Sequence, residues 1–238
     1  MPATGRLFVI PSTLGLVPAE AVLPRRTLDI ARGLTHFVAE TPKAARSFLK
    51  GLDLAHPLQG LDIAELSEHT PAECVPALLA PALAGNDIGL VSDAGCPGIA
   101  DPGARLVAAA HRAGVRVIPL PGSSAIFLAL MASGFDGQAF AFHGYLPVRS
   151  GPRAARIKSL DDAVGRSATT QIFIETPYRN EAMVGALVAT CSPSTQLCVA
   201  ADLTLDSEEV VRRSIALWRS AQRPSFAGRP AVFLLGKA

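Results

Sequence analysis

Short apolar runs alternate with helical stretches through the first half of the chain, and this alternation limits the possible folds severely. Apolar runs cover 7–10, 36–39, 63–66, 88–92 and 115–120, and helical patterns cover 24–34, 42–52, 71–84 and 102–113. Each helical stretch opens with a proline, which is tolerated at a first helical position because the N–H it lacks is not needed there. "TPAE" at 70–73 has the spacing of a capping box, and Gly85 and Gly114 suit helix ends. The alternation predicts a mostly parallel sheet with helices on both faces.

After Leu120 the spacing of the strands becomes less regular. A helix is expected at 123–133, and further helical patterns cover 153–163 and 178–190. Strands are expected at 140–144, 171–174, 196–201 and 231–235, with a short segment at 208–213. Consecutive strands near the end can pair antiparallel, which favours a mixed sheet. We therefore expect two α/β domains, residues 1–120 with a mostly parallel sheet and residues 121–238 with a mixed sheet.

Composition narrows the class of protein. Hydrophobic residues make up 49% of the chain and charged residues 18%, as in a globular protein, and the net charge of +2 neither favours nor excludes nucleic acid. The four cysteines form no C-x-x-C pair and the five histidines are scattered, so no metal site is expected. No apolar run approaches the ~18 residues of a membrane helix. These features indicate a cytoplasmic protein that does not enter a membrane.

The stretch "LVSDAGCPGIADPG" at 90–103 follows an apolar run and is unusually rich in small residues. Gly95 and Gly98 let the backbone approach a ligand, and Asp101 is expected to cap the next helix. "IPSTLG" (10–15) and "PLPGSSA" (119–125) also follow strands. Three such loops at one sheet edge predict a cleft for a nucleotide-like ligand, although a well-capped turn is the alternative for the first. No G-x-G-x-x-G or phosphate-cradle motif is present.

A fourth motif, "IETPYRN" at 174–180, places charged residues where a strand passes into a helix. Glu175 ends the apolar run, and Arg179 lies in the first helical turn, where a cation is unfavourable. One interpretation is a carboxylate and a guanidinium held at the mouth of the cleft. The other is an ordinary helix start with Thr176 as its cap.

Taken in order, "PSTLG", "SDAGCPGIADPG", "PLPGSSA" and "FIETPYRN" resemble the tetrapyrrole-methylase superfamily, the class III S-adenosylmethionine-dependent methyltransferases. Within it the sequence is most similar to the 16S ribosomal RNA ribose 2′-O-methyltransferases and their uncharacterised paralogues. The resemblance implies two α/β domains with S-adenosylmethionine in the cleft between them, and a homodimer. The cofactor-binding positions that it implies are Leu14, Gly15, Asp93, Ala94, Gly95, Cys96, Ile99, Ser124, Ala125, Glu175, Thr176, Ala200, Pro230 and Ala231.

Methyl transfer to a hydroxyl requires alignment of the reactants and a base near the attacking oxygen. Four residues at expected loop edges are candidates for this base, with a cap or surface role as the alternative for each: Asp93, Glu40, Glu175 and His69. No metal is needed. For RNA, a basic face is expected from Arg153, Arg156 and Lys158, with Arg179 at the cleft, although a solvated helix face fits the three equally well.

Three functions are compatible with the sequence. The first is a methyltransferase of RNA, in particular the ribose 2′-OH of ribosomal RNA. The second is a methyltransferase of a small molecule such as a tetrapyrrole. The third is a paralogue that binds S-adenosylmethionine without catalysis, because "AETPK" at 39–43 departs from the "AEDTR" of the ribosomal RNA enzymes.

Overall fold

The computed structural model describes residues 4–237, which divide after Ser124 into two compact units, 4–124 (unit 1) and 125–237 (unit 2). The boundary falls after Ser124 and not after residue 120, because the segment that follows the last strand of unit 1 bonds back to that unit. Thr27 Oγ1 donates to the carbonyl of Pro121 at 2.7 Å, and Ser123 Oγ donates to the carbonyl of Val22 at 3.2 Å.

Unit 1 is built on a five-stranded sheet in the order β3-β2-β4-β1-β5, and every pairing is parallel. The strands are β1 (Arg6–Ile10), β2 (His36–Ala39), β3 (Asp62–Glu65), β4 (Ile88–Val91) and β5 (Arg116–Pro119). All four residues of β4 are buried, as expected for a central strand covered on both faces. The parallel sheet predicted from the alternating pattern is confirmed.

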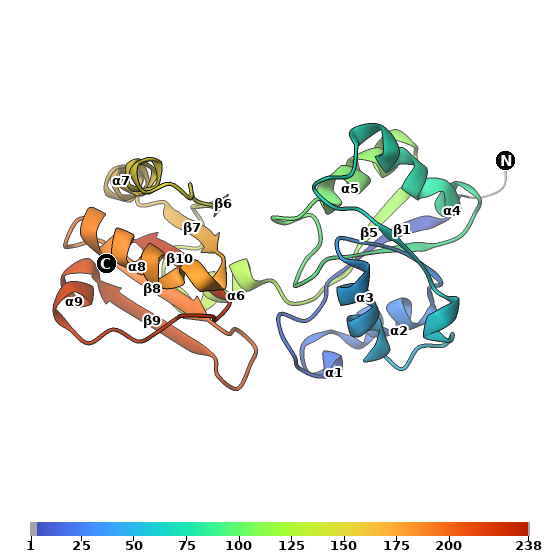
Figure 1. Cartoon of the computed structure of the whole chain (residues 1–238), viewed down its shortest axis with the longest axis horizontal. Coiled ribbons are helices and arrows are strands. Elements are labelled where there is room, and N and C mark those ends of the chain that lie inside the picture. Colours follow the sequence, from blue (N-terminus) through green and yellow to red (C-terminus); the bar gives the residue numbers. More distant parts are fainter. Residues whose placement is uncertain (1–3, 238) are drawn as a thin grey trace. The chain divides into compact units, whose positions relative to one another are not determined.

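Helices cover both faces of this sheet (Figure 1). Phe8, Ile10 and Phe37 pack with α1 and α2 on one face, whereas Leu7 and Leu90 pack with α5 on the other. The first layer contains α1 (Ala19–Val22), α2 (Arg25–Gly33), α3 (Pro42–Lys50) and the short η1 (Leu58–Gly60). The second contains the 3-10 helix η2 (Ala72–Leu79), α4 (Ala80–Leu83) and α5 (Gly103–Arg112). Side chains alternate between the two cores because successive residues of a strand face opposite sides.

The helical stretch predicted over 71–84 is present, but it divides into the 3-10 helix η2 and the short α4. The 3-10 form occupies most of it, because Pro76 lies inside and cannot donate the backbone hydrogen bond of an α-helix. The capping box predicted at Thr70 is wrong, since Thr70 Oγ1 accepts the N–H of Ser67 at 3.0 Å. Only Pro42 occupies a first helical position. The other three prolines stand one residue earlier, at Pro24, Pro71 and Pro102.

Unit 2 contains a mixed five-stranded sheet in the order β6-β7-β10-β8-β9. Its strands are β6 (Phe140–Tyr145), β7 (Thr170–Glu175), β8 (Gln196–Ala201), β9 (Glu209–Ser214) and β10 (Ala231–Gly236). The β6–β7 pairing is parallel, and the other three pairings are antiparallel. The predicted mixed sheet is therefore confirmed, with β10 at its centre.

The larger core of unit 2 lies on the face covered by α7 (Ser150–Ser167), α8 (Asn180–Thr190) and α9 (Ile215–Ser220). Phe173 and Phe233 stack there with ring centroids 5.6 Å apart. Helix α6 (Ala125–Ser133) packs against β8, β9 and β10. Helix α9 was not expected from the sequence. It begins after Ser214, whose hydroxyl accepts the N–H of Leu217, and it buries Trp218 completely.

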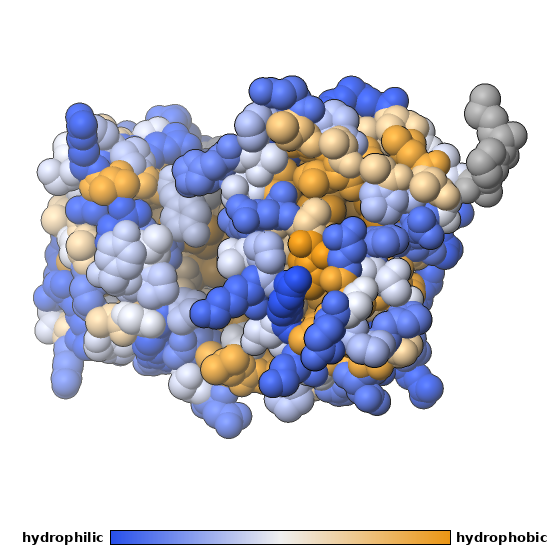
Figure 2. Space-filling view, turned by 45° about the vertical axis from the view of Figure 1, so that its right-hand side comes forward, coloured by the Kyte–Doolittle hydropathy of each residue, from blue (hydrophilic) through white to orange (hydrophobic). Residues whose placement is uncertain are grey.

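The described surface combines hydrophilic side chains with clusters of apolar ones, as the face drawn in Figure 2 shows. Large apolar side chains exposed in the described residues include Leu16 in unit 1 and Phe127 and Met131 in unit 2. Within residues 4–237, no helix combines the length and apolar character needed to cross a membrane.

Candidate functional site

Three loops follow β1, β4 and β5 at the carboxyl edge of the unit 1 sheet, and hydrogen bonds join them. The N–H of Ser12 donates to the carbonyl of Gly95 at 2.9 Å, and its hydroxyl donates to the carbonyl of Ser92 at 3.1 Å. Cys96 Sγ lies 3.4 Å from the carbonyl of Ser123. Because ligands of open parallel sheets bind outside the carboxyl ends of the strands, these loops occupy the position of a binding site.

Gly95 lies where the three loops meet, and the structure requires glycine there. Its φ of +71° lies in the left-handed region that other residues rarely adopt. A Cβ at this position would lie 3.0 Å from Leu14 Cδ2 and 3.5 Å from the carbonyl oxygen of Ser123. Further along the loop, Asp101 Oδ1 accepts the N–H groups of Gly98 and Gly103 at 2.8 and 2.6 Å. This loop geometry leaves backbone, not side chain, at the junction.

A cavity of about 330 Å³ opens beside these loops within unit 1. The loop after β1 forms one side of it, and Ala44, Ser47 and Phe48 of α3 form another. Of the predicted cofactor residues, Leu14, Gly15 and Asp93 line this cavity. Ala94, Gly95, Cys96 and Ile99 lie on the loop after β4, and Ser124 ends the loop after β5.

Acidic side chains gather at the same edge. Asp93 accepts two hydrogen bonds from Thr41, at 3.1 Å from the N–H and 2.7 Å from the hydroxyl. Burial raises the pKa of Glu40, and the negative charges of Asp93, Asp101 and Glu68 raise it further. Burial also raises the pKa of Asp101. Among residues 4–237, no group of three or more acidic, histidine or cysteine side chains is arranged to hold a metal ion.

His69, the fourth candidate base, lies on the loop between β3 and η2. Its side chain is 86% exposed, and its only ion-pair contact in the described chain is Glu68, with 3.5 Å between His69 Nε2 and Glu68 Oε1. This environment gives the ring no fixed orientation toward the cavity.

In unit 2, the sheet register brings the remaining predicted cofactor residues to one edge. Ala231, at the start of β10, pairs with Glu175 at the end of β7 and with Ala201 at the end of β8. Pro230 precedes Ala231, and its carbonyl accepts the N–H of Asp202 at 2.9 Å. The predicted residues assembled there are Glu175, Thr176, Ala200, Pro230 and Ala231. Ala125 begins α6.

Glu175 and Arg179 form an ion pair. This agrees with the carboxylate and guanidinium of the first interpretation of "IETPYRN". The Glu175 side chain is completely buried, and its Oε1 accepts hydrogen bonds from Arg179 and from the N–H and hydroxyl of Thr176. Thr176 therefore does not cap the helix with its side chain. Glu175 Oε2 is buried without a hydrogen-bond partner among the described residues. A buried carboxylate oxygen without a donor is costly, so this atom is suited to a ligand N–H or O–H.

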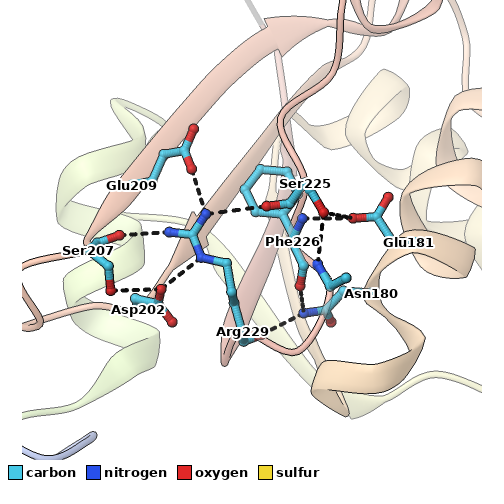
Figure 3. Close-up of polar contacts among 9 residues, drawn as sticks. Asn180, Glu181, Asp202, Ser207, Glu209, Ser225, Phe226 and Arg229 are labelled. Carbon is cyan, nitrogen blue, oxygen red and sulfur yellow. Dashed lines mark hydrogen bonds and ion pairs between the residues drawn. The ribbon is translucent and has the colours of Figure 1, made fainter.

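Arg229 organises the same edge of unit 2, and the sequence analysis did not identify it (Figure 3). Its guanidinium bonds to Asp202 Oδ2 at 2.7 Å and to Glu209 Oε2 at 2.6 Å, and it also reaches the carbonyls of Ser207 and Ser225. Asp202 has a φ of +52°, an unfavourable value for aspartate that this network holds in place. The motif "GRPAVF" contains Arg229, but its two carboxylate partners, Asp202 and Glu209, lie 27 and 20 residues earlier in the sequence.

The basic residues predicted on α7 do not form one group. Lys158 pairs with Asp162, with 2.7 Å between Nζ and Oδ1. Arg156 instead contacts His143 on β6, with 2.9 Å between its NH2 group and Nδ1. Arg153 has no carboxylate partner in the described chain. The face predicted from the sequence therefore separates into a neutralised lysine and two arginines without a counter-charge.

Comparison with known proteins identifies the class that this fold and edge geometry define. The family model described as Tetrapyrrole (Corrin/Porphyrin) Methylases matches residues 19–217, and the chain belongs to this family. Solved structures agree in fold. The methyltransferase CobJ superposes with a TM-score of 0.66 at 20% identity, covering 99% of this chain and 95% of that one. A uroporphyrin-III C-methyltransferase from Thermus thermophilus, complexed with S-adenosylhomocysteine, gives 0.57 at 16% identity, covering 98% and 97%.

Several curated relatives carry one name, ribosomal RNA small subunit methyltransferase I. The protein from Mycobacterium bovis is 35% identical over 91% of this chain and 73% of its own length. The one from Escherichia coli is 32% identical over 87% and 68%. The protein from Mesorhizobium japonicum is 40% identical over 60% of this chain and 47% of its own length. The matches thus span from about half to about three quarters of these relatives.

Proposed function

We propose that this chain is an S-adenosylmethionine-dependent methyltransferase that modifies a ribose 2′-hydroxyl of ribosomal RNA. The observation that carries the proposal is the junction at Gly95, where the loops after β1, β4 and β5 present backbone and small side chains beside a cavity. Family membership and the shared name of the curated relatives support the reaction and the RNA substrate.

The hydrogen-bonding groups of the predicted site suit this cofactor. When bound, S-adenosylmethionine would supply an electrophilic methyl group on a sulfonium, and its amino and hydroxyl groups are hydrogen-bond donors. Glu175 Oε2, in unit 2, is a buried acceptor without a donor among the described residues. We propose that the predicted cofactor residues of unit 1 hold this group, with Leu14 and Gly15 beside the cavity.

Glu40 is the candidate base that the electrostatics favour. A general base works best when its pKa lies near the operating pH, and burial together with three acidic neighbours moves the Glu40 pKa upward. Both oxygens of Asp93 already accept hydrogen bonds from Thr41, and Glu175 is committed to Arg179. Replacement of Glu40 by Gln is expected to lower kcat with little change in cofactor affinity.

The cofactor proposal is tested by calorimetric titration with S-adenosylmethionine and S-adenosylhomocysteine. Gly95→Ala is compared with Gly114→Ala, because both glycines have similar positive φ values, +71° and +69°, but nothing lies within 4 Å of a Cβ at Gly114. Both variants carry the same backbone strain, so only Gly95→Ala is expected to weaken binding, at least tenfold. Absence of binding by the unchanged protein would overturn the proposal.

The acceptor is tested with labelled S-adenosylmethionine and three substrates: small ribosomal subunits, their naked RNA and a porphyrinoid. Ribose-linked label in RNA supports the proposal. Label in the porphyrinoid favours the small-molecule alternative, for which the fold of the solved structures is the supporting observation. Cofactor binding with no transfer to any of the three favours the non-catalytic paralogue.

We further propose a homodimer in the cytoplasm. All four cysteines are free thiols, as expected in a reducing compartment, and burial raises the pKa of Cys191 and of Cys198 to about 12. Sedimentation equilibrium is expected to give twice the 24.8 kDa of the chain, and the monomer mass would contradict the dimer.

A further inference from the structure

The segment from Gly137 to Leu160 carries four basic residues and no acidic one. It comprises β6 and the first half of α7, and the carboxylates Asp161 and Asp162 follow only at its end. Lys158 is the residue nearest to them and pairs with Asp162. The positive charge that is not neutralised therefore lies earlier, at Arg149, Arg153 and Arg156.

Arg156 is held in place by a neutral chain of hydrogen bonds. Gln171 Nε2 donates to the carbonyl of Thr169 at 2.8 Å, which turns Gln171 Oε1 toward His143. His143 Nε2 donates to that oxygen at 2.7 Å, and this leaves Nδ1 as the acceptor for the Arg156 guanidinium at 2.9 Å. His143 is thus a neutral partner that fixes the orientation of Arg156 without cancelling its charge.

Arg153 lies one helical turn before Arg156, so the two guanidinium stems emerge on the same face of α7. Arg153 Nε has no hydrogen-bond partner among the described residues. Two other arginines of unit 2 pair with carboxylates, Arg179 with Glu175 and Arg229 with Asp202 and Glu209. Two adjacent arginines with no carboxylate partner repel each other, an arrangement that an anion bound between them would stabilise.

We propose that Arg153 and Arg156 form a phosphate-binding site for the RNA backbone, with His143 as the positioning residue of Arg156. The inference rests on the proposed function and assigns the substrate contact to one face of unit 2. A guanidinium group can donate two parallel hydrogen bonds to the oxygens of one phosphate. Such contacts position an RNA without recognising its bases. Lys158 is excluded from this site by its pairing with Asp162.

The test uses fluorescence anisotropy of a labelled RNA hairpin from the small ribosomal subunit, titrated at several salt concentrations. Arg153→Ala/Arg156→Ala is compared with Lys158→Ala/Arg166→Ala, which removes the same charge from the same helix. The first variant is expected to bind the hairpin at least thirtyfold more weakly. The slope of the logarithm of the association constant against the logarithm of the salt concentration is negative, and its magnitude should decrease by about 1.4 to 1.8, the value for two lost phosphate contacts. The control should lose less than threefold.

Substitutions of His143 provide a second test, because they leave the charges of both arginines in place. His143→Gln retains an acceptor for Arg156 and is expected to preserve RNA binding within threefold, whereas His143→Leu should weaken it about tenfold. Equal binding by the two arginine variants, or by the two His143 variants, would overturn the proposal. Titration of every variant with S-adenosylhomocysteine is a separate readout. If the arginine variant loses RNA binding but retains cofactor binding, the result supports the phosphate site. If the unchanged protein does not bind the cofactor, that result contradicts the proposed function and leaves the phosphate site to the RNA titrations.

Discussion

Thr41 donates two hydrogen bonds to Asp93 and so joins the loop after β2 to the loop after β4. The two residues are 52 positions apart in sequence, but β2 and β4 are neighbours in the sheet. The pair braces the floor of the candidate site, because Asp93 also lines the cavity. Asp93 thereby acts as a fixed acceptor that holds two loops at a constant separation.

Thr41→Val removes one of these bonds while keeping the backbone N–H. We expect a loss of about 1 kcal/mol in the free energy of unfolding, the usual contribution of such a bond, together with weaker cofactor binding. Urea denaturation measures the first and calorimetry the second. Thr35→Val is the control, since the Thr35 hydroxyl has no hydrogen bond among residues 4–237 in the structure. Equal effects of both substitutions would contradict the bracing role.

Glu40→Gln is expected to stabilise the protein at neutral pH. A carboxyl group whose pKa is raised by folding contributes stability below its unfolded pKa of about 4.3 and loses it as the pH rises through the folded pKa. At pH 7 the charged Glu40 therefore opposes folding, and the amide does not. Thermal unfolding between pH 3.5 and 8 should show a gain that disappears at the acidic end. Glu65→Gln, at the exposed last residue of β3, is the control.

Asp161→Asn should have the opposite pH dependence. Burial by itself raises the pKa of Asp161, but hydrogen bonds from Thr195 and Ser192 outweigh this effect and lower it. Its contribution to stability is present above the unfolded pKa of about 3.9 and is lost as the pH falls through the folded pKa. We expect a loss of about 2 kcal/mol at pH 7 that shrinks in acid. Asp206→Asn, at an exposed position of the same unit, is the control.

Arg229→Ala should destabilise unit 2 by about 2 kcal/mol, since it leaves the buried Asp202 without its counter-charge. The expected loss is below that of a fully buried pair because the Arg229 side chain is 23% exposed. Chemical denaturation followed by the single tryptophan, Trp218, reports on this unit directly. Arg6→Ala breaks an exposed pair with Asp87 in unit 1 and should leave the Trp218 transition unchanged. A shift as large in this control would argue against a local effect.

Local sequence patterns were sufficient to predict most strands of both units. Their apolar runs are bounded by proline and glycine, and both signals act over a few residues. The 3-10 conformation at 72–79 was also visible in principle, because Pro76 interrupts the helical pattern there. The loops of the candidate site were recognisable for the same local reason, since small residues directly follow buried strands.

The residue pairings at the site depend on strand order, so they could not be predicted from local sequence patterns. Thr41 meets Asp93 only because β2 lies beside β4, and Arg229 meets Asp202 only because β10 lies beside β8. The basic residues of α7 show the same limit at short range. Charge spacing groups Arg153, Arg156 and Lys158 together, whereas the partner of Arg156 lies on β6 and that of Lys158 lies one turn further along the helix.

The strand at the centre of the unit 2 sheet, β10, is the last strand of that sheet to be synthesised. A ribosome produces β6, β7, β8 and β9 before the strand that joins β7 to β8. Unit 1 has all of its strands once Pro119 has been synthesised, so it can fold while unit 2 is still being translated. Until Gly236 leaves the exit tunnel, β7 and β8 each expose an unpaired edge to other chains. During synthesis, unit 2 is therefore the part of the chain more exposed to edge-to-edge association.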